Sequence, residues 1–179
     1  MNHTKVHSLV SCALIAALYA ALTLCLAPLS FGIVQIRFAE ALSILAVFTP
    51  NAIWGLTVGC MLSNAIGFAT GLNPAGFIDI FFGSAATLIA ALLAYMLRNV
   101  KIKGFPVLST IPPVIVNGII VGAELTFFES NPFNFTLYGI NFLSVSAGQV
   151  LPCMGVGLFL YFILRQFKLD TRLFGRQNH

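Results

Sequence analysis

The feature of this sequence that most restricts its fold is a series of apolar stretches that follow one another with few charges between them. Several of them approach the roughly 20 residues that an α-helix needs to cross about 30 Å of hydrocarbon. Only 8% of the 179 residues are charged, whereas about a quarter are charged in soluble domains. The sequence therefore predicts an all-α, polytopic integral membrane protein. It contains no GxxxxGKS or GxxxxGKT loop, so we expect no ATP hydrolysis by that route.

The stretches are best accounted for by six membrane-spanning helices in one domain that covers residues 1–179. We place these helices at about 8–30, 32–50, 52–70, 77–97, 106–127 and 140–164. The first apolar run is longer than that of a signal peptide and is followed by further spans, so we expect it to be retained as a helix. The second span differs from the others because it contains Arg37 and Glu40 and ends at Pro50.

The positions of the basic residues predict how the chain is oriented. Eight of the nine Lys and Arg residues lie near the N-terminus, in one loop or in the C-terminal tail: Lys5, Arg98, Lys101, Lys103, Arg165, Lys168, Arg172 and Arg176. Cytoplasmic segments of membrane proteins carry an excess of Lys and Arg. We therefore expect a multi-pass protein of the cell membrane with both termini in the cytoplasm, and we do not interpret the charge as a nucleic-acid-binding patch.

Polar side chains from four of the spans fall at a similar depth in the membrane. A rise of about 1.5 Å per residue places Glu40 roughly 15 Å from the inner face, with Arg37 one turn farther out. The same count places three amides in this layer, those of Asn64, Asn117 and Gln149, and puts Asp79 and Glu124 nearer the outer mouth.

Charges at this depth are expensive, so they are functional candidates. The alternatives are that Arg37 and Glu40 pair with each other or snorkel outward, and that each amide only links two helices. Because the residues share one layer, we predict a polar substrate pocket that opens outward. Its predicted binding residues are Gln35, Arg37, Glu40, Asn64, Asp79, Asn117, Glu124 and Gln149.

Catalytic and metal sites find little support in the sequence. No histidine falls in the polar layer, and no G-x-S-x-G motif occurs, so we expect no enzyme. Four cysteines lie in apolar stretches without metal-ligand spacing: Cys12, Cys25, Cys60 and Cys153. We interpret them as small core residues and expect neither a metal nor a cofactor.

Small residues recur at a spacing of four in two of the stretches. Such stripes let membrane helices approach closely. In the third stretch the stripe is Gly55, Gly59, Ser63, Gly67 and Gly71, for which we predict packing inside the bundle. The stripe of the first stretch, Ala13, Ala17 and Ala21, fits either internal packing or the docking of an outside partner.

Four segments taken in order carry a resemblance to a known family. They are FGIVQIRFAEAL, FTPNAIWGLTVGCMLSNAIG, FIDIFFGSAATL and PPVIVNGIIVGAEL, and their most specific parts are RxxEAL, GCxxxN and PPVxVN. The chain resembles, over nearly its whole length, the QueT family. These proteins are substrate-binding S components of energy-coupling factor (ECF) transporters and are assigned to queuosine precursors.

The resemblance implies a six-helix S-component fold with an outward-facing pocket for a 7-deazaguanine-type precursor. It also implies a membrane coupling subunit and two ATPase subunits as partners. The face of Ala13, Ala17 and Ala21 would contact the coupling subunit. One departure is Gly148-Gln149, because the sixth helix of the family often carries an acidic residue after the glycine.

The chemistry of such a ligand suits acidic side chains. A 7-deazaguanine presents an N–H and an NH₂ side by side, which one carboxylate can accept, and an aminomethyl form adds a cation that favours a second carboxylate. Three alternatives remain at this point: a self-sufficient proton-coupled carrier that uses Glu40, an S component for another vitamin-like substrate, and a small intramembrane enzyme. Many carriers show internal repeats, and we find no convincing repeat here.

Overall fold

The computed structural model describes residues 3–32 and 35–169, and the regular structure in these ranges is helical apart from one isolated bridge in a loop. In chain order the elements are α1 (His3–Cys25), α2 (Ala27–Ser30), η1 (Phe38–Val47), α3 (Asn51–Ala69), α4 (Asp79–Met96), η2 (Val107–Thr110), α5 (Ile111–Glu129), α6 (Phe135–Val150), η3 (Leu151–Val156) and α7 (Gly157–Gln166). Five helical stretches in the described ranges are long and apolar enough to cross a membrane: Val6–Cys25, Asn51–Ala69, Asp79–Met96, Val107–Glu129 and Phe135–Gln166. The chain is therefore a multi-pass membrane protein.

The expected long helix at 32–50 is wrong. Residues 35–37 are not helical, and only Phe38–Val47 forms a helix, which is of the 3-10 type. Nine of its ten residues are buried, and it packs against α1, α3, α4, α7 and η3. Irregular backbone is tolerated at membrane depth where protein covers it, and this segment has that cover. The tighter helix rises about 2.0 Å per residue, so Glu40 and Val47 lie roughly 14 Å apart along the axis, farther than an α-helical count gives.

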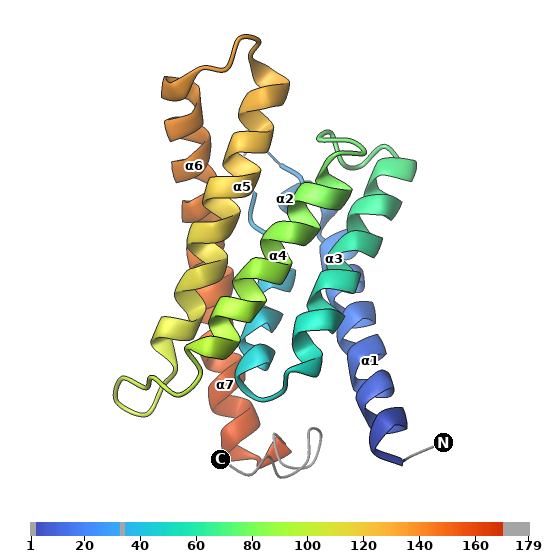
Figure 1. The fold of residues 1–179 in the computed structure, drawn as a ribbon, viewed down its shortest axis with the longest axis vertical. Helices are drawn as coiled ribbons and strands as arrows, with labels where there is room; N and C mark the ends of the chain where they lie inside the picture. The colour runs from blue at the N-terminus through green and yellow to red at the C-terminus, as the bar shows by residue number, and fades with distance from the viewer. Residues whose placement is uncertain (1–2, 33–34, 170–179) are drawn as a thin grey trace.

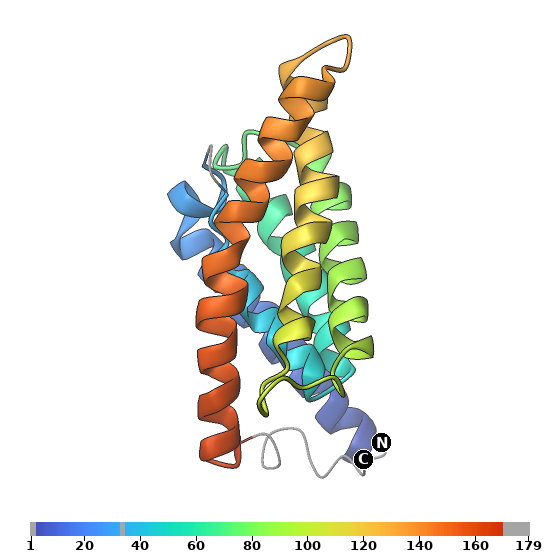
Figure 2. The same ribbon diagram turned by 90° about the vertical axis from the view of Figure 1, so that its left-hand side faces the viewer.

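The first and the last long helix have their outer ends on the same side of the bundle. Helix α1 starts there, α7 finishes there, and the loop that follows α4 also lies there (Figures 1 and 2). We call this the terminal end. The loops between α3 and α4 and between α5 and α6 lie at the opposite end, which we call the far end (Figure 1). The basic loop residues Arg98, Lys101 and Lys103 are thus at the terminal end, whereas Arg172 and Arg176 lie outside the described residues.

Helices α1 and α3 pack closely because α3 presents glycines to α1. A Cβ atom on Gly55 would lie 2.9 Å from the carbonyl oxygen of Cys12, and one on Gly59 would lie 2.8 Å from that of Ala16. Ser63 and Gly67 are buried as well, so the prediction of internal packing for this stripe is confirmed, except at Gly71, which lies in the loop beyond the helix.

The alanine stripe of α1 points the other way. Ala13, Ala17 and Ala21 are exposed, whereas Ala16 and Tyr19 on the opposite side of the helix are buried against α3 and η1. The two faces of α1 are therefore distinct: one is built into the bundle, and the other is exposed and carries the three alanines beside Leu14 and Leu18.

The last spanning stretch begins earlier than expected and changes its pitch near Pro152. It begins at Phe135 because the side chain of Asn134 caps it, accepting hydrogen bonds from the backbone N–H groups of Thr136 (2.9 Å) and Leu137 (3.2 Å). Pro152 has no N–H donor, and the helix takes π geometry over Leu151–Val156 before it resumes as α7.

Candidate functional site

All eight predicted binding residues are buried, with no more than 4% of any of them exposed. They come from the segment that leads into η1 and its first turn, and from α3, α4, α5 and α6. The positions of Asn64 late in α3 and of Asp79 at the start of α4 place the site in the half of the bundle nearer the far end (Figure 1).

Arg37 forms an ion pair with Asp79. Its Nη2 lies 3.5 Å from Oδ2 of Asp79, and that oxygen also accepts a 2.7 Å hydrogen bond from Nδ2 of Asn73. The guanidinium further donates from Nη1 to Sγ of Cys60 at 3.6 Å and lies 5.6 Å from the centre of the Phe31 ring. The simple pairing of Arg37 with Glu40 is therefore wrong, because Arg37 reaches across to α4.

Glu40 uses only one of its two carboxylate oxygens within the protein. Oε1 accepts hydrogen bonds from the hydroxyl of Tyr19 at 2.5 Å and from Oγ1 of Thr87 at 3.2 Å. Oε2 is buried and has no hydrogen-bond partner in the described part of the chain. The amide of Asn117 lies near enough to interact with Glu40, yet its Nδ2 has no partner either. One free acceptor and one free donor thus lie close together.

Asn64 ties α3 to the start of α4. Its Nδ2 donates to the backbone oxygen of Asp79 at 2.8 Å and to Sγ of Cys60 at 3.6 Å, while its Oδ1 has no partner. Gly83 makes this approach possible, because a Cβ there would collide with side-chain atoms of Asp79 and Asn64.

Gln35 and Gln149 lie where α6 packs against the segment that leads into η1. A Cβ on Gly148 would lie only 2.5 Å from the backbone oxygen of Gln35, so α6 rests directly on that segment. Oε1 of Gln149 accepts from Sγ of Cys153 at 3.8 Å, and the same sulfur also lies 3.8 Å from the backbone oxygen of Glu40. Gln149 is therefore linked to Glu40 through Cys153.

Glu124 has both carboxylate oxygens buried and without a hydrogen-bond partner. It lies seven residues, or about two helical turns, after Asn117, and therefore on the same side of α5. Its carboxyl group lies close enough to Asp79 and Arg37 for electrostatic interaction with both. Glu40, Asp79 and Glu124 thus share the site with one guanidinium, so carboxylates outnumber cations among the buried residues described here.

Buried polar atoms without partners are the main property of the site. Among the described residues, the site atoms without a hydrogen bond are Nε of Arg37, Oε2 of Glu40, Oδ1 of Asn64, Oδ1 of Asp79, Nδ2 of Asn117, and Oε1 and Oε2 of Glu124, whereas Nη2 of Arg37 has only its ion pair with Asp79. Most buried polar groups in proteins are hydrogen-bonded, and an unsatisfied one costs about 1–3 kcal/mol. The site therefore carries both hydrogen-bond donors and acceptors that the described residues leave unused.

Sequence reasoning missed several residues that shape this site. Tyr19 and Thr87 hold Glu40, Asn73 holds Asp79, and Cys60 contacts both Arg37 and Asn64. The depth count that found Asn64 would also have found Tyr19 and Thr87, because both are polar groups within apolar spans. Cys60 and Cys153 thus belong to the polar site, and Cys25 is exposed, so the interpretation of the cysteines as core residues is wrong for Cys25.

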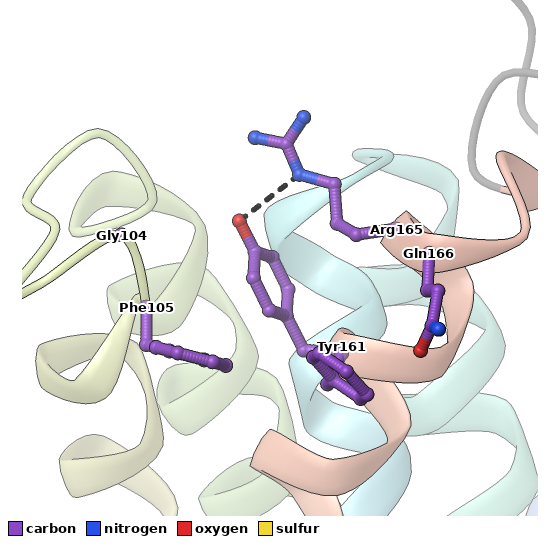
Figure 3. A pocket seen from close by; sticks show the side chains of 6 residues that line it. Gly104, Phe105, Tyr161, Arg165 and Gln166 are labelled. Carbon is purple, nitrogen blue, oxygen red and sulfur yellow. Dashed lines mark hydrogen bonds between the residues drawn. The ribbon is translucent and has the colours of Figure 1, made fainter.

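A separate groove of about 590 Å³ lies at the terminal end (Figure 3). It is lined by Gly104, Phe105, Tyr161, Phe162, Arg165 and Gln166. Nε of Arg165 donates to the hydroxyl of Tyr161 at 3.2 Å. None of the eight predicted binding residues lines this groove.

Comparison with known proteins gives two matches. A family model described as QueT transporter matches residues 9–166. The queuosine precursor transporter QueT of Lactococcus lactis subsp. cremoris (strain MG1363) is 33% identical to the chain over 99 residues, which is 54% of each protein. The chain thus spans about half the length of this curated relative. No solved structure matches.

Proposed function

The chain belongs to the QueT transporter family, and from this premise we propose that it binds a queuosine precursor of the 7-deazaguanine type in the buried polar site and serves its import. The observation that carries the proposal is the set of buried donors and acceptors around Glu40 that have no hydrogen-bond partner among the described residues. The matched relative is named as a queuosine precursor transporter, which supports the ligand class.

The edges of a 7-deazaguanine suit the free atoms of the site. Its adjacent N–H and NH₂ groups need acceptors, which Oε2 of Glu40 and Oδ1 of Asn64 offer, and its carbonyl needs a donor, which Nδ2 of Asn117 or Nε of Arg37 offers. Bonds to the charged partners would be the stronger ones.

The charge of the site favours a cationic form of the ligand. With Asp79 paired to Arg37, Glu40 and Glu124 have no cationic partner among the described residues. Leaving a buried charge without compensation is strongly unfavourable, and an aminomethyl group on the ligand would supply an ammonium to Glu124. We therefore propose that an amine-bearing 7-deazaguanine binds more tightly than the same ring without the amine.

We further propose that the protein is an ECF S component with six passages through the membrane, of which the segment of η1 forms one. Its partners would be a membrane coupling subunit and two ATPase subunits, which agrees with the lack of an ATP-binding loop in the sequence. The exposed face of Ala13, Ala17 and Ala21 offers a surface for the coupling subunit. The basic loop at the terminal end supports a cytoplasmic location of both termini.

Calorimetric titration of the detergent-purified protein tests the ligand class. We expect binding of 7-deazaguanine, tighter binding of its aminomethyl derivative and no binding of adenine, which lacks the paired donors. Equal affinity for adenine and the deazaguanines would contradict the proposal.

A further inference from the structure

Tyr19 is a fully buried tyrosine whose hydroxyl meets the central carboxylate of the site. The oxygen-to-oxygen distance to Oε1 of Glu40 is 2.5 Å, at the short end of the range for a hydrogen bond to a charged acceptor. Its Cβ packs closely on α3, because a Cβ on Gly59 would lie 2.7 Å from it. No part of the side chain is exposed, so the ring is enclosed by the bundle.

The two donors on Oε1 fix the orientation of the Glu40 carboxylate. A carboxylate oxygen has two lone pairs, and Tyr19 from α1 and Thr87 from α4 occupy both. The carboxylate cannot rotate about its terminal bond without losing one of these bonds. Oε2 remains for a further donor: it makes no hydrogen bond with the described residues, and the nearby amide of Asn117 also lacks a partner.

We propose that Tyr19 is a positioning residue for ligand binding: it holds Oε1 of Glu40 so that Oε2 is presented to the donor edge of the ligand. This inference rests on the proposed function, since it assumes that the ligand bonds to Glu40. It also changes the contact that we expected from the sequence, in which one carboxylate accepts both donors of the ligand. Here Glu40 accepts one donor through Oε2, and the second donor binds to another acceptor. Without the hydroxyl of Tyr19, Oε1 loses one of its two donors and the carboxylate is held by Thr87 alone.

The test is a double-mutant cycle with Tyr19→Phe and Glu40→Gln in the full-length protein, with 7-deazaguanine as the probe. Tyr19→Phe keeps the ring and removes only the donor. We expect it to weaken binding about tenfold in the wild-type background, because the hydrogen bond that orients the Glu40 carboxylate before binding is lost. In the Glu40→Gln background we expect less than a twofold further loss, because Tyr19 acts through Glu40.

Tyr161→Phe is the matched control. This tyrosine is also buried, and its hydroxyl accepts a hydrogen bond from Arg165 in the groove at the terminal end. We expect unchanged affinity. If Tyr19→Phe does not fold, Thr87→Val removes the other donor to Oε1 and must show the same dependence on Glu40, with a smaller loss.

The outcomes separate the inference from the proposed function. If Glu40→Gln weakens binding but Tyr19→Phe does not, or if Tyr19→Phe weakens it equally in both backgrounds, the positioning role is overturned. If Glu40→Gln leaves the affinity unchanged, the proposed contact between Glu40 and the ligand is itself wrong.

Discussion

The two acidic residues at the centre of the site have different partners, and this difference decides what happens when each is changed. Glu40 is held by two hydroxyls and has a free oxygen, whereas Asp79 neutralises Arg37. Removing the charge of Glu40 should therefore affect ligand binding first, and removing the charge of Asp79 should affect stability first.

Glu40→Gln keeps the size of the side chain and leaves the ion pair between Arg37 and Asp79 in place. We expect the fold to survive and binding of 7-deazaguanine to weaken by roughly ten- to a hundredfold, because a desolvated bond to a charged group contributes about 1.5–3 kcal/mol. Calorimetry measures the loss of affinity, and a thermal melt of the same preparation measures whether the fold survives. Wild-type affinity in a well-folded variant would exclude Glu40 as a ligand contact.

Asp79→Asn leaves Arg37 as a buried cation without an anionic partner. Breaking a buried pair in this way costs about 3–5 kcal/mol, so we expect a lower melting temperature and a lower yield of inserted protein. Glu129→Gln is the control, because Glu129 is exposed at the end of α5 and accepts one hydrogen bond from Asn141. Equal stability of the two variants would show that Arg37 does not depend on Asp79.

Single residues also show how far the sequence was informative. Burial of the eight polar positions followed from their depth within apolar spans. Their partners did not follow, because Arg37 and Asp79 are far apart in sequence and meet only when η1 packs on α4. The contact of Tyr19 with Glu40 was missed for the same reason, because 21 residues separate the two in the sequence.

Among the elements, hydropathy predicted the five long spanning stretches but not the form of the second passage. A long apolar helix can be predicted from its length and composition. The segment of η1 is short, covered by protein and partly extended, and no local signal distinguishes its 3-10 geometry from an α-helix. The N-cap at Asn134 could have been predicted, because Asn is a preferred N-cap residue, and this cap explains why α6 begins earlier than expected.

The contact between α1 and α3 gives a matched pair of glycine substitutions. Gly59→Ala places a methyl group against the backbone of Ala16 and the side chain of Tyr19, and we expect it to destabilise the protein by about 1–3 kcal/mol. Gly139→Ala in α6 meets open space, and we expect it to be neutral or slightly stabilising. Thermal melts in detergent compare the two. A Gly59→Ala protein as stable as the Gly139→Ala protein would argue against close packing of these helices.

The outer face of α1 is tested by Ala17→Trp. A bulky ring on this exposed row of alanines should block close approach of another helix. We expect ligand binding by the isolated protein to persist while co-purification with the coupling and ATPase subunits is lost. Leu92→Trp, at an exposed position on α4, is the control and should leave assembly unchanged. Normal assembly of the Ala17→Trp protein would remove the alanine face from the proposed interface.

For the whole molecule, the proposed function predicts that the protein cannot drive uptake alone. In proteoliposomes that contain only this chain, we expect no concentrative uptake of labelled 7-deazaguanine under a proton gradient, and ATP-dependent uptake once the partner subunits are added. Gradient-driven uptake by the chain alone would instead identify a self-sufficient carrier.

Helix α1 touches the interior and the exterior of the molecule with opposite faces. Tyr19 contacts the carboxylate of the site on one side, and the alanine face is exposed on the other. A ligand and an outside partner would therefore act on one shared element. By thermodynamic reciprocity, any factor by which cargo changes the affinity for the partner is the factor by which the partner changes the affinity for cargo. Binding of cargo and binding of the proposed partner subunits would then be two equilibria that share one coupling free energy, which can be measured from either side.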